Sequence, residues 1–276
     1  MSRVALTVFP VWGEIGIERD YSTAIADAYV SEKATPDVST LMVANTGSRP
    51  LLLLEGQVLD GGWQNRMVAR SVVVAPNDEV AVDVVCVEAG RWGGQRRHAG
   101  LRRRASTRLQ AGLRAGDNRQ NEVWKRVSEY ESRYGANATS SFSEHANRAA
   151  GDISRLTDGL RPFPGQIGIV IAISGYPLSA ELFDSPTTLA EQYQPIVAAA
   201  AMDAVGRPGE VTPSRRVRRF INHANEIPLR RTVAAGAGVT FVGDTEDSSV
   251  SLLRWQRRDV HTSVLNLRHE LVGCST

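Results

Sequence analysis

The sequence predicts an α+β fold, with antiparallel, β-sandwich-like sheets at both ends of the chain and a helical segment between them. Short apolar and β-branched runs, broken by Gly, Pro, Asn and Asp, fill 1–92 and much of 165–270, which is typical of strands and turns. Over 100–159 the apolar residues recur at helical spacing instead. Because no repeat or low-complexity linker interrupts the 276 residues, we expect a single compact domain, 1–276.

The N-terminal part, 1–92, is predicted to be mainly strands. Thr46-Gly47 and the run from Pro76 to Asp78 supply turn residues between them. Ala24, Ile25 and Ala28 lie at helical spacing, so 21–29 is predicted to be one short helix. The clearest strand-like runs are 4–9, 40–44, 51–55, 71–74 and 80–87.

The rest of the chain is predicted to be two or three amphipathic helices over 100–159 and then a mixed α/β part over 165–270. The almost continuously apolar run 167–173 predicts a strand buried on both faces, with a turn at 174–177 and a hairpin partner at 178–183. Ser185-Pro186 opens a predicted helix that Pro195 should kink or divide. A short helix at 215–224 and strands at 230–234, 238–243, 249–256 and 260–267 complete the expectation.

Composition excludes several classes of protein. No stretch approaches the roughly 20 apolar residues of a membrane-spanning helix, and the apolar run after Met1 is too short for a signal peptide, so we expect a cytoplasmic protein without a membrane partner. Cys86 and Cys274 are too far apart in sequence to indicate a disulfide framework or a metal site. The five histidines show no helical pairing with carboxylates, so no metal is assigned and the cofactor stays open.

Positive charge is concentrated in one segment although the formal net charge is only +2. Between 91 and 126, eleven basic residues stand against Asp117 and Glu122. A nucleic-acid backbone could bind there, but aromatic residues for stacking are few. Because Leu101, Leu109 and Leu113 alternate with the arginines, a solvated helix face or a homo-oligomer interface is favoured. A smaller cluster comprises Arg215, Arg216, Arg218 and Arg219.

Two stretches carry polar residues where their neighbours are apolar. The first is an apolar strand that ends in Glu55, followed by glycines and then by Gln64, Asn65 and Arg66. The second is the strand that contains Cys86 and Glu88, followed by Arg91 and Trp92. Because side chains alternate along a strand, Cys86 and Glu88 are expected to share a face. We expect the two hairpin ends to form one polar cluster.

The motifs LLLLEGQVLDGGWQNR, VVCVEAGRW, QNEVWKRV and GQIGIVIAISG, with ELF downstream, are specific in their spacing. Over about 6–261 the chain resembles a bacterial family of uncharacterised domains named for association with ADP-ribosylglycohydrolases and rhodanese-phosphatase proteins. The resemblance implies a role with ADP-ribose or related nucleotides, in stress or defence signalling. The matching positions here are Glu55, Gln64, Asn65, Arg66, Cys86, Glu88, Arg91 and Trp92.

From these residue types we expect a small phosphorylated nucleotide or sugar to be bound or hydrolysed; whether the chain is an enzyme stays open. Arginine forks hold phosphates, carboxylates accept from ribose or activate water, amides orient the ligand and indole rings stack on bases. The expected catalytic residues are Glu55 and Glu88, and the expected ligand-binding residues are Gln64, Asn65, Arg66, Arg91 and Trp92.

Two alternatives stand beside this expectation. Glu55–Arg66 and Glu88–Arg91 could be buried ion pairs that fix strand ends in a non-enzymatic, oligomeric interaction protein. Cys86 could be a nucleophile if a nearby cation lowered its pKa, but a cysteine between valines is more often a small apolar residue.

Overall fold

The computed structural model describes residues 5–14, 18–99, 103–233 and 235–273. Contacts within the chain cluster into two compact units. One comprises 1–19, 151–233 and 239–276, and the other comprises 20–150 and 234–238. The expectation of one compact domain over 1–276 stays a prediction.

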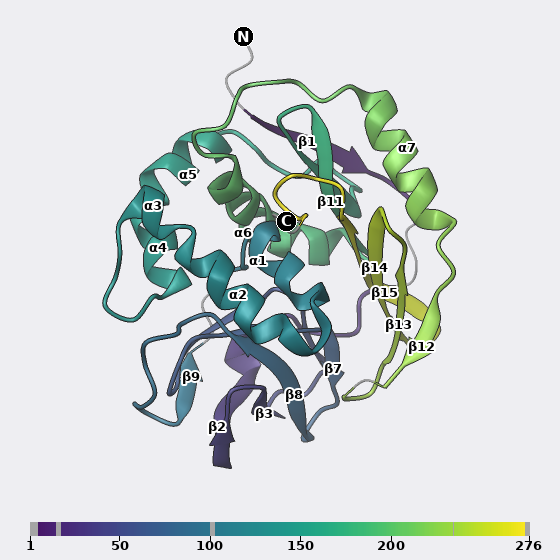
Figure 1. Ribbon diagram of the computed structural model, residues 1–276. Coiled ribbons are helices and arrows are strands. Elements are labelled where there is room, and N and C mark those ends of the chain that lie inside the picture. The colour runs from purple at the N-terminus through teal and green to yellow at the C-terminus, as the bar shows by residue number, and fades with distance from the viewer. Residues whose placement is uncertain (1–4, 15–17, 100–102, 234, 274–276) are drawn as a thin grey trace. The chain divides into compact units, whose positions relative to one another are not determined.

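The unit of 20–150 and 234–238, here the barrel unit, is built on a closed antiparallel barrel with strand order β2-β3-β8-β6-β5-β9. Figure 1 labels β2, β3, β8 and β9 of this barrel. Its interior is an apolar core that includes Val30, Leu41, Val43, Val68 and Val84. The barrel strands are β2 (Ala28–Asp37), β3 (Thr40–Asn45), β5 (Val58–Gly61), β6 (Arg66–Val68), β8 (Glu79–Cys86) and β9 (Arg97–Ala99). A separate pair comprises β4 (Leu51–Leu53) and β7 (Val72–Val74).

Two expectations for this unit need correction. The N-terminal strands close into a barrel, where we expected a sandwich-like sheet. The helix expected at 21–29 is wrong: only a 3-10 turn, η1 (Ile25–Asp27), forms, and β2 begins at Ala28. Ala28 pairs with Asn45, and Thr46 donates to the carbonyl of Asp27 at 2.8 Å. Pairing with a distant strand therefore overrides the local helical spacing.

The central helical segment is confirmed, but it is broken into more pieces than expected. The barrel unit holds α1 (Thr107–Ala111), α2 (Arg119–Ser128), α3 (Glu131–Tyr134) and α4 (Phe142–Arg148), with 3-10 turns η2 (Gly112–Arg114) and η3 (Gly116–Asn118). Helix α2 packs against β8 through a side chain of its first turn. Gln120 accepts from the backbone N–H of Cys86 at 2.9 Å and donates to its carbonyl at 3.0 Å. Gln120 thus satisfies backbone groups at the end of β8.

The other unit, here the sheet unit, contains a seven-stranded antiparallel sheet of order β1-β10-β11-β15-β14-β13-β12. Strand β10 is buried at every residue, which confirms the expectation of a strand covered on both faces. The predicted hairpin of β10 with β11 and the four C-terminal strands are also present. The strands are β1 (Leu6–Val11), β10 (Gly168–Ile173), β11 (Tyr176–Phe183), β12 (Arg230–Thr232), β13 (Val239–Asp244), β14 (Ser248–Trp255) and β15 (Arg258–Asn266).

Helices of the sheet unit are α5 (Ala150–Thr157), α6 (Pro186–Ala204) and α7 (Ser214–Asn225). Ser185 caps α6 as predicted, because its hydroxyl accepts from the N–H of Thr187 at 3.2 Å. Of the two outcomes expected at Pro195, a kink or a division, the division is not observed, because α6 runs unbroken from Pro186 to Ala204. The proline removes one hydrogen bond, at a cost of roughly 3 kcal/mol, and burial of the apolar side chains of α6 offsets that cost.

One face of this sheet lies under α7. Val170, Ala180, Val264 and Val250 are register partners across β10, β11, β15 and β14, so their side chains form a row on one face. Phe220 and its neighbours on α7 pack onto that row. None of the helices in the described part of the chain has the length and apolar character needed to cross a bilayer.

Candidate functional site

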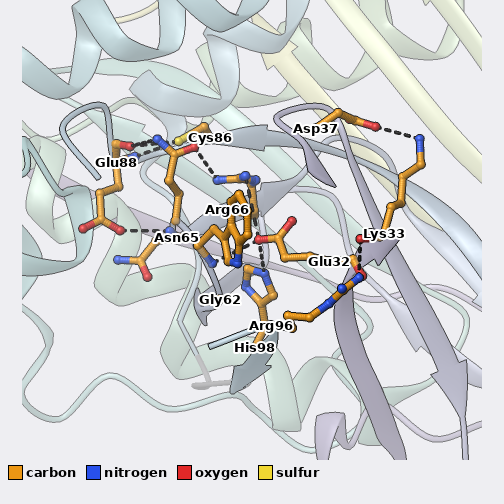
Figure 2. Close-up of polar contacts among 12 residues, drawn as sticks. Glu32, Lys33, Asp37, Gly62, Asn65, Arg66, Cys86, Glu88, Arg96 and His98 are labelled. Atoms are coloured by element: carbon orange, nitrogen blue, oxygen red, sulfur yellow. Dashed lines mark hydrogen bonds and ion pairs between the residues drawn. The ribbon is translucent and has the colours of Figure 1, made fainter. Parts of the chain in front are cut away.

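The two hairpin ends expected to carry the site do meet in the barrel unit. Arg66 is the register partner of Leu59 on β5 and of Cys86 on β8, so β6 links the two stretches. Just beyond these strands, Val87 donates its backbone N–H to the carbonyl of Asn65 at 3.0 Å. Glu88 therefore lies beside Asn65, as Figure 2 shows.

Glu88 is the centre of a dense hydrogen-bond network. Its Oε1 accepts from Arg91 Nε at 3.0 Å and from Thr139 Oγ1 at 2.7 Å. Its Oε2 accepts from Arg91 Nη2 at 2.7 Å and from the backbone N–H of Asn65 at 2.9 Å. Burial raises the pKa of Glu88, but these hydrogen bonds outweigh it and the pKa is lowered overall. Glu88 is thus held as a carboxylate.

Arg91 directs its guanidinium at protein oxygens. Besides Glu88, its Nη1 donates to the carbonyl of Gly62 at 2.7 Å and to that of Gly93 at 3.2 Å. Its Nη2 donates to the carbonyl of Gly61 at 3.2 Å and to Asn65 Oδ1 at 3.4 Å. A guanidinium has five N–H donors, so these contacts occupy the donors of Arg91. Arg91 therefore fixes the connection between β5 and β6.

Arg66 lies inside the barrel, between Asn65 and Glu32 in Figure 2, and is completely buried. Its Nη1 donates to Gln64 Oε1 at 2.9 Å, and Gln64 Nε2 donates to the carbonyl of Glu88 at 2.9 Å. Its nearest ion-pair partner is Glu32, with Nη2 4.0 Å from Oε1. Nε and Nη2 of Arg66 make no hydrogen bond with the described residues. The guanidinium therefore depends on Gln64 and Glu32.

Glu32 and His98 complete this buried group. Glu32 Oε1 accepts from the backbone N–H of Trp63 at 3.1 Å and lies 3.1 Å from His98 Nε2. Burial lowers the pKa of His98 even though the Glu32 carboxylate opposes that change. The side chains of Glu32, Arg66 and His98 are all fully buried.

Trp92 is half exposed, at 51% of its surface, above this group. Its ring centroid lies 5.8 Å from Arg66 Cζ, and it meets the Trp63 ring edge-on with centroids 5.3 Å apart. Trp92 was expected to bind a ligand through its indole ring. The structure places Trp92 and Trp63 in one aromatic pair, with Arg66 beneath Trp92.

Cys86 is buried and not poised as a nucleophile. Its Sγ donates to the carbonyl of Glu88 at 3.0 Å. Burial raises the pKa of the thiol, although Arg66 acts in the opposite direction. A nucleophilic cysteine needs a lowered pKa, so the structure favours the small apolar role for Cys86.

Glu55 lies apart from the other predicted residues. Its Oε1 accepts from Arg114 Nη2 at 2.6 Å, and its backbone N–H donates to Ser71 Oγ at 2.9 Å. The ion pair considered between Glu55 and Arg66 is therefore not formed, whereas the pair of Glu88 with Arg91 is. Of the predicted residues, the hydrogen bonds bring together Gln64, Asn65, Arg66, Glu88 and Arg91.

A pocket of about 670 Å³ lies beside Glu88 and Asn65. Asp60 accepts a hydrogen bond there from Ser143, and its buried Oδ2 has no partner among the described residues. Ser141 Oγ accepts from Asn65 Nδ2 at 3.2 Å. Every residue that lines the pocket is polar or charged: Asp60, Asn65, Glu88, Arg103, Thr139, Ser141, Ser143, Glu144, Asn147 and Arg148.

Several residues of this region were not predicted from the sequence. Asp60 lies within the motif that contains Glu55 and Gln64, so its position was a usable signal. Glu32, Thr139 and Ser141 come from distant segments without a local motif, and only chain folding brings them here. Among the described residues, no group of three or more His, Cys, Asp or Glu side chains is arranged to hold a metal ion.

The described arginines of the basic segment 91–126 are largely engaged within the chain. Arg114 pairs with Glu55, and Arg119 pairs with Asp83 through two hydrogen bonds of 2.7 and 2.5 Å. Arg96 donates to the carbonyl of Lys33 at 2.5 Å. Arg103, Arg108 and Arg126 likewise contact oxygens of the chain, Arg97 lies over the Tyr29 ring, and Arg102 falls outside the described residues.

Fold and site together define a class: α+β proteins with a closed antiparallel barrel, a buried ion-pair group in the barrel and an all-polar pocket beside it. The model of one family, described as the ARG and Rhodanese-Phosphatase-superfamily-associated Protein domain, matches residues 1–265. The chain belongs to this family. No curated protein and no solved structure matches it.

Proposed function

We propose that the chain binds a ribose-containing, nucleotide-derived phosphate compound of the ADP-ribose type in the pocket beside Glu88. The observation that carries the proposal is the lining, which is polar or charged throughout. Pockets for ordinary small molecules are mostly apolar with a few polar groups. A lining of carboxylates, amides, hydroxyls and guanidiniums suits a ligand rich in hydroxyl groups and phosphates.

The ribose would bind to α4. Glu144 and Asn147 are three residues apart on this helix, so both face the pocket. Glu144 Oε1 accepts from Arg148 at 2.8 Å, and its Oε2 remains to accept from a sugar hydroxyl. Asn147 Oδ1 accepts from Arg103 at 2.5 Å, which leaves its amide N–H groups as donors. Adjacent hydroxyls of a ribose can bind both groups.

Arg103 is the phosphate ligand in this proposal. Its Nη1 donates to the carbonyl of Ser143 at 2.8 Å and its Nη2 to Asn147. A guanidinium has five N–H donors, so donors remain for phosphate oxygens. Arg91, which the sequence suggested for this role, instead holds Glu88 and the β5–β6 connection in place.

The carboxylates take different roles if the ligand is hydrolysed. Glu88 already accepts four hydrogen bonds from protein groups and has a lowered pKa, which suits holding one wall of the pocket in place more than accepting a proton. Asp60 lines the pocket, accepts one hydrogen bond from Ser143 and would be the carboxylate that assists water. We interpret ARG in the family description as ADP-ribosylglycohydrolase, which favours an ADP-ribose-like ligand and a signalling role.

Isothermal titration with ADP-ribose, NAD, ribose 5-phosphate and free adenine tests the proposal. We expect at least one ribose phosphate to bind and adenine not to bind. A ligand at 100 times its Kd should also stabilise the fold by roughly 2.7 kcal/mol. Arg103→Gln and Glu144→Gln should each weaken binding about 10-fold or more, because each removes a charged hydrogen-bond partner.

Glu246→Gln, at a side chain that is 90% exposed on the sheet unit, is the matched control and should bind as the wild type does. If no ribose phosphate binds the wild type, or if both pocket variants bind as tightly as the control, the ligand proposal fails.

A structural role is the second candidate, because the donors of Arg91 are directed at protein oxygens. In that case the chain is an interaction protein that assembles as a homo-oligomer, and the Glu88 network only fixes the barrel. Sedimentation analysis of a chain that binds none of the four ligands would then give a mass above 30.0 kDa.

A further inference from the structure

We propose that the exposed arginine face of α7 binds the phosphodiester backbone of double-stranded nucleic acid. Between Ser214 and Asn225 the helix contains four arginines and no acidic residue. Its apolar side chains, among them Val217 and Phe220, are buried against the sheet. Arg215, Arg218 and Arg219 are exposed on the opposite side. They form the surface referred to here as the α7 face.

The arginines of the α7 face differ from those of 91–126 in contacting no partner among the described residues. Arg216, their neighbour, pairs with Glu210 and lies over the Tyr176 ring at 4.1 Å. Arg215, Arg218 and Arg219 make no hydrogen bond, ion pair or ring contact with any residue that the structure describes. Three like charges this close repel one another, so an external anion would relieve an existing repulsion.

Their geometry suits phosphates that follow one another along a strand. Positions i, i+3 and i+4 lie on one side of a helix, and at 1.5 Å per residue they span about 6 Å along its axis. They line a hollow of about 490 Å³ together with Asn222, His223 and Glu226. Guanidinium forks match phosphate oxygens in pairs, and Asn222 adds further hydrogen-bonding groups.

The polar side chains of α7 favour a nucleic-acid duplex over a membrane or a small phosphate compound as the partner. Every exposed residue of α7 is polar, and its apolar face is committed to the core, so no apolar surface of α7 is left to insert between lipids. The three guanidiniums are exposed and do not converge on an enclosed site, as they would for a compact ligand. The α7 face also lacks aromatic rings for stacking, which favours a duplex over a single strand.

The test is binding of the full chain to a fluorescent DNA duplex of 20 base pairs, measured by anisotropy from 50 to 200 mM salt. Three phosphate contacts predict a slope of log K against log salt of about −2.7, which is a roughly 40-fold loss of affinity over this range. The triple variant Arg215→Gln, Arg218→Gln, Arg219→Gln should lose most of the binding at 50 mM salt. Its melting temperature should stay at or above that of the wild type, because none of the three side chains has a partner in the part of the chain that the structure describes.

The control variant is Arg155→Gln, Arg161→Gln, Arg257→Gln, which removes the same charge from exposed positions of the sheet unit. It should bind duplex as the wild type does, and RNA duplex should bind comparably. The proposal is overturned if the wild type does not bind, or if both triple variants lose affinity equally. It is also overturned if vesicles with phosphatidylserine, or single-stranded DNA, bind the α7 face more tightly than duplex does.

Discussion

Glu88 and Arg91 contact more protein groups than the pair of Arg119 with Asp83 does. Arg119 and Asp83 also share two hydrogen bonds, but their side chains are 29% and 40% exposed. The side chain of Glu88 is 5% exposed, and its remaining acceptor capacity is taken by Thr139 and by backbone of the β5–β6 connection. The same carboxylate–guanidinium pairing thus belongs to a buried hydrogen-bond network at Glu88, whereas at Asp83 it lies nearer the surface.

Glu88→Gln should destabilise the fold by about 2–4 kcal/mol, because the Glu88 side chain is only 5% exposed and its carboxylate holds both Arg91 and the backbone of the β5–β6 connection. Asp83→Asn is the matched control, since an exposed pair contributes at most about 1 kcal/mol. Urea unfolding measures both free energies. Equal losses in the two variants would show that burial does not distinguish the pairs.

The connection between β5 and β6 is the element that positions the site. Gly62 adopts φ +56° there, and its carbonyl accepts from Arg91. A Cβ on Gly62 would lie 1.9 Å from Nε2 of His98, which is held on β9 against Glu32. The connection therefore packs directly on the buried Glu32–Arg66–His98 group.

Gly62→Ala should cost about 2–4 kcal/mol, from a left-handed backbone that disfavours Ala and from overlap with a ring that cannot move freely. Gly116→Ala separates the two causes: Gly116 has φ +57° but no atom within 4 Å of an added Cβ. That variant should cost only about 1 kcal/mol. Thermal or urea unfolding checks the difference; similar costs would mean that the overlap with His98 is relieved easily.

Across the described part of the molecule, three histidines have a pKa shifted toward the neutral form. Burial is the main cause that lowers the pKa of His98, His145 and His269 below 6.5. Hydrogen bonds agree with this for two of them, because His145 Nε2 lies 3.1 Å from the amide nitrogen of Asn137 and His269 Nδ1 accepts from the N–H of Leu271. A nitrogen that accepts a hydrogen bond carries no proton.

Stability should therefore decrease as the pH falls below about 6.5. Histidine side chains of the unfolded chain take up protons near pH 6.5, and those of the folded chain do so only at lower pH. Between these two pH values the unfolded state therefore binds more protons. Each histidine contributes at most about 1.4 kcal/mol per pH unit. Urea unfolding at pH 8, 7, 6 and 5 should give a plateau above 7 and a decline below 6.5.

His98→Gln should make that decline less steep, because glutamine can still donate to Glu32 but does not titrate. An unchanged slope in this variant, or greater stability at pH 5 than at pH 7, would contradict the assignment of buried neutral histidines.

The spacing of apolar residues was sufficient to predict a helix or a strand where the segment is uniformly apolar or clearly amphipathic. The buried strand β10, the capped start of α6 and the short helix α7 were predicted, because solvent exposure along each segment follows its own residue pattern. The motifs also predicted that Gln64, Asn65, Arg66, Glu88 and Arg91 would meet. Two hairpin ends carry them, and strand pairing joins those ends.

Tertiary structure alone decided which charges pair and which side chains face the pocket. Glu55 pairs with Arg114 and not with Arg66, and Glu32 and Thr139 reach the site from segments without a local motif. The described arginines of 91–126 are largely engaged within the chain, whereas three arginines on α7 have no partner among the residues with a described structure. Local pattern fixes the faces of a helix or strand, but partners distant in sequence depend on register and barrel closure, which no short stretch encodes.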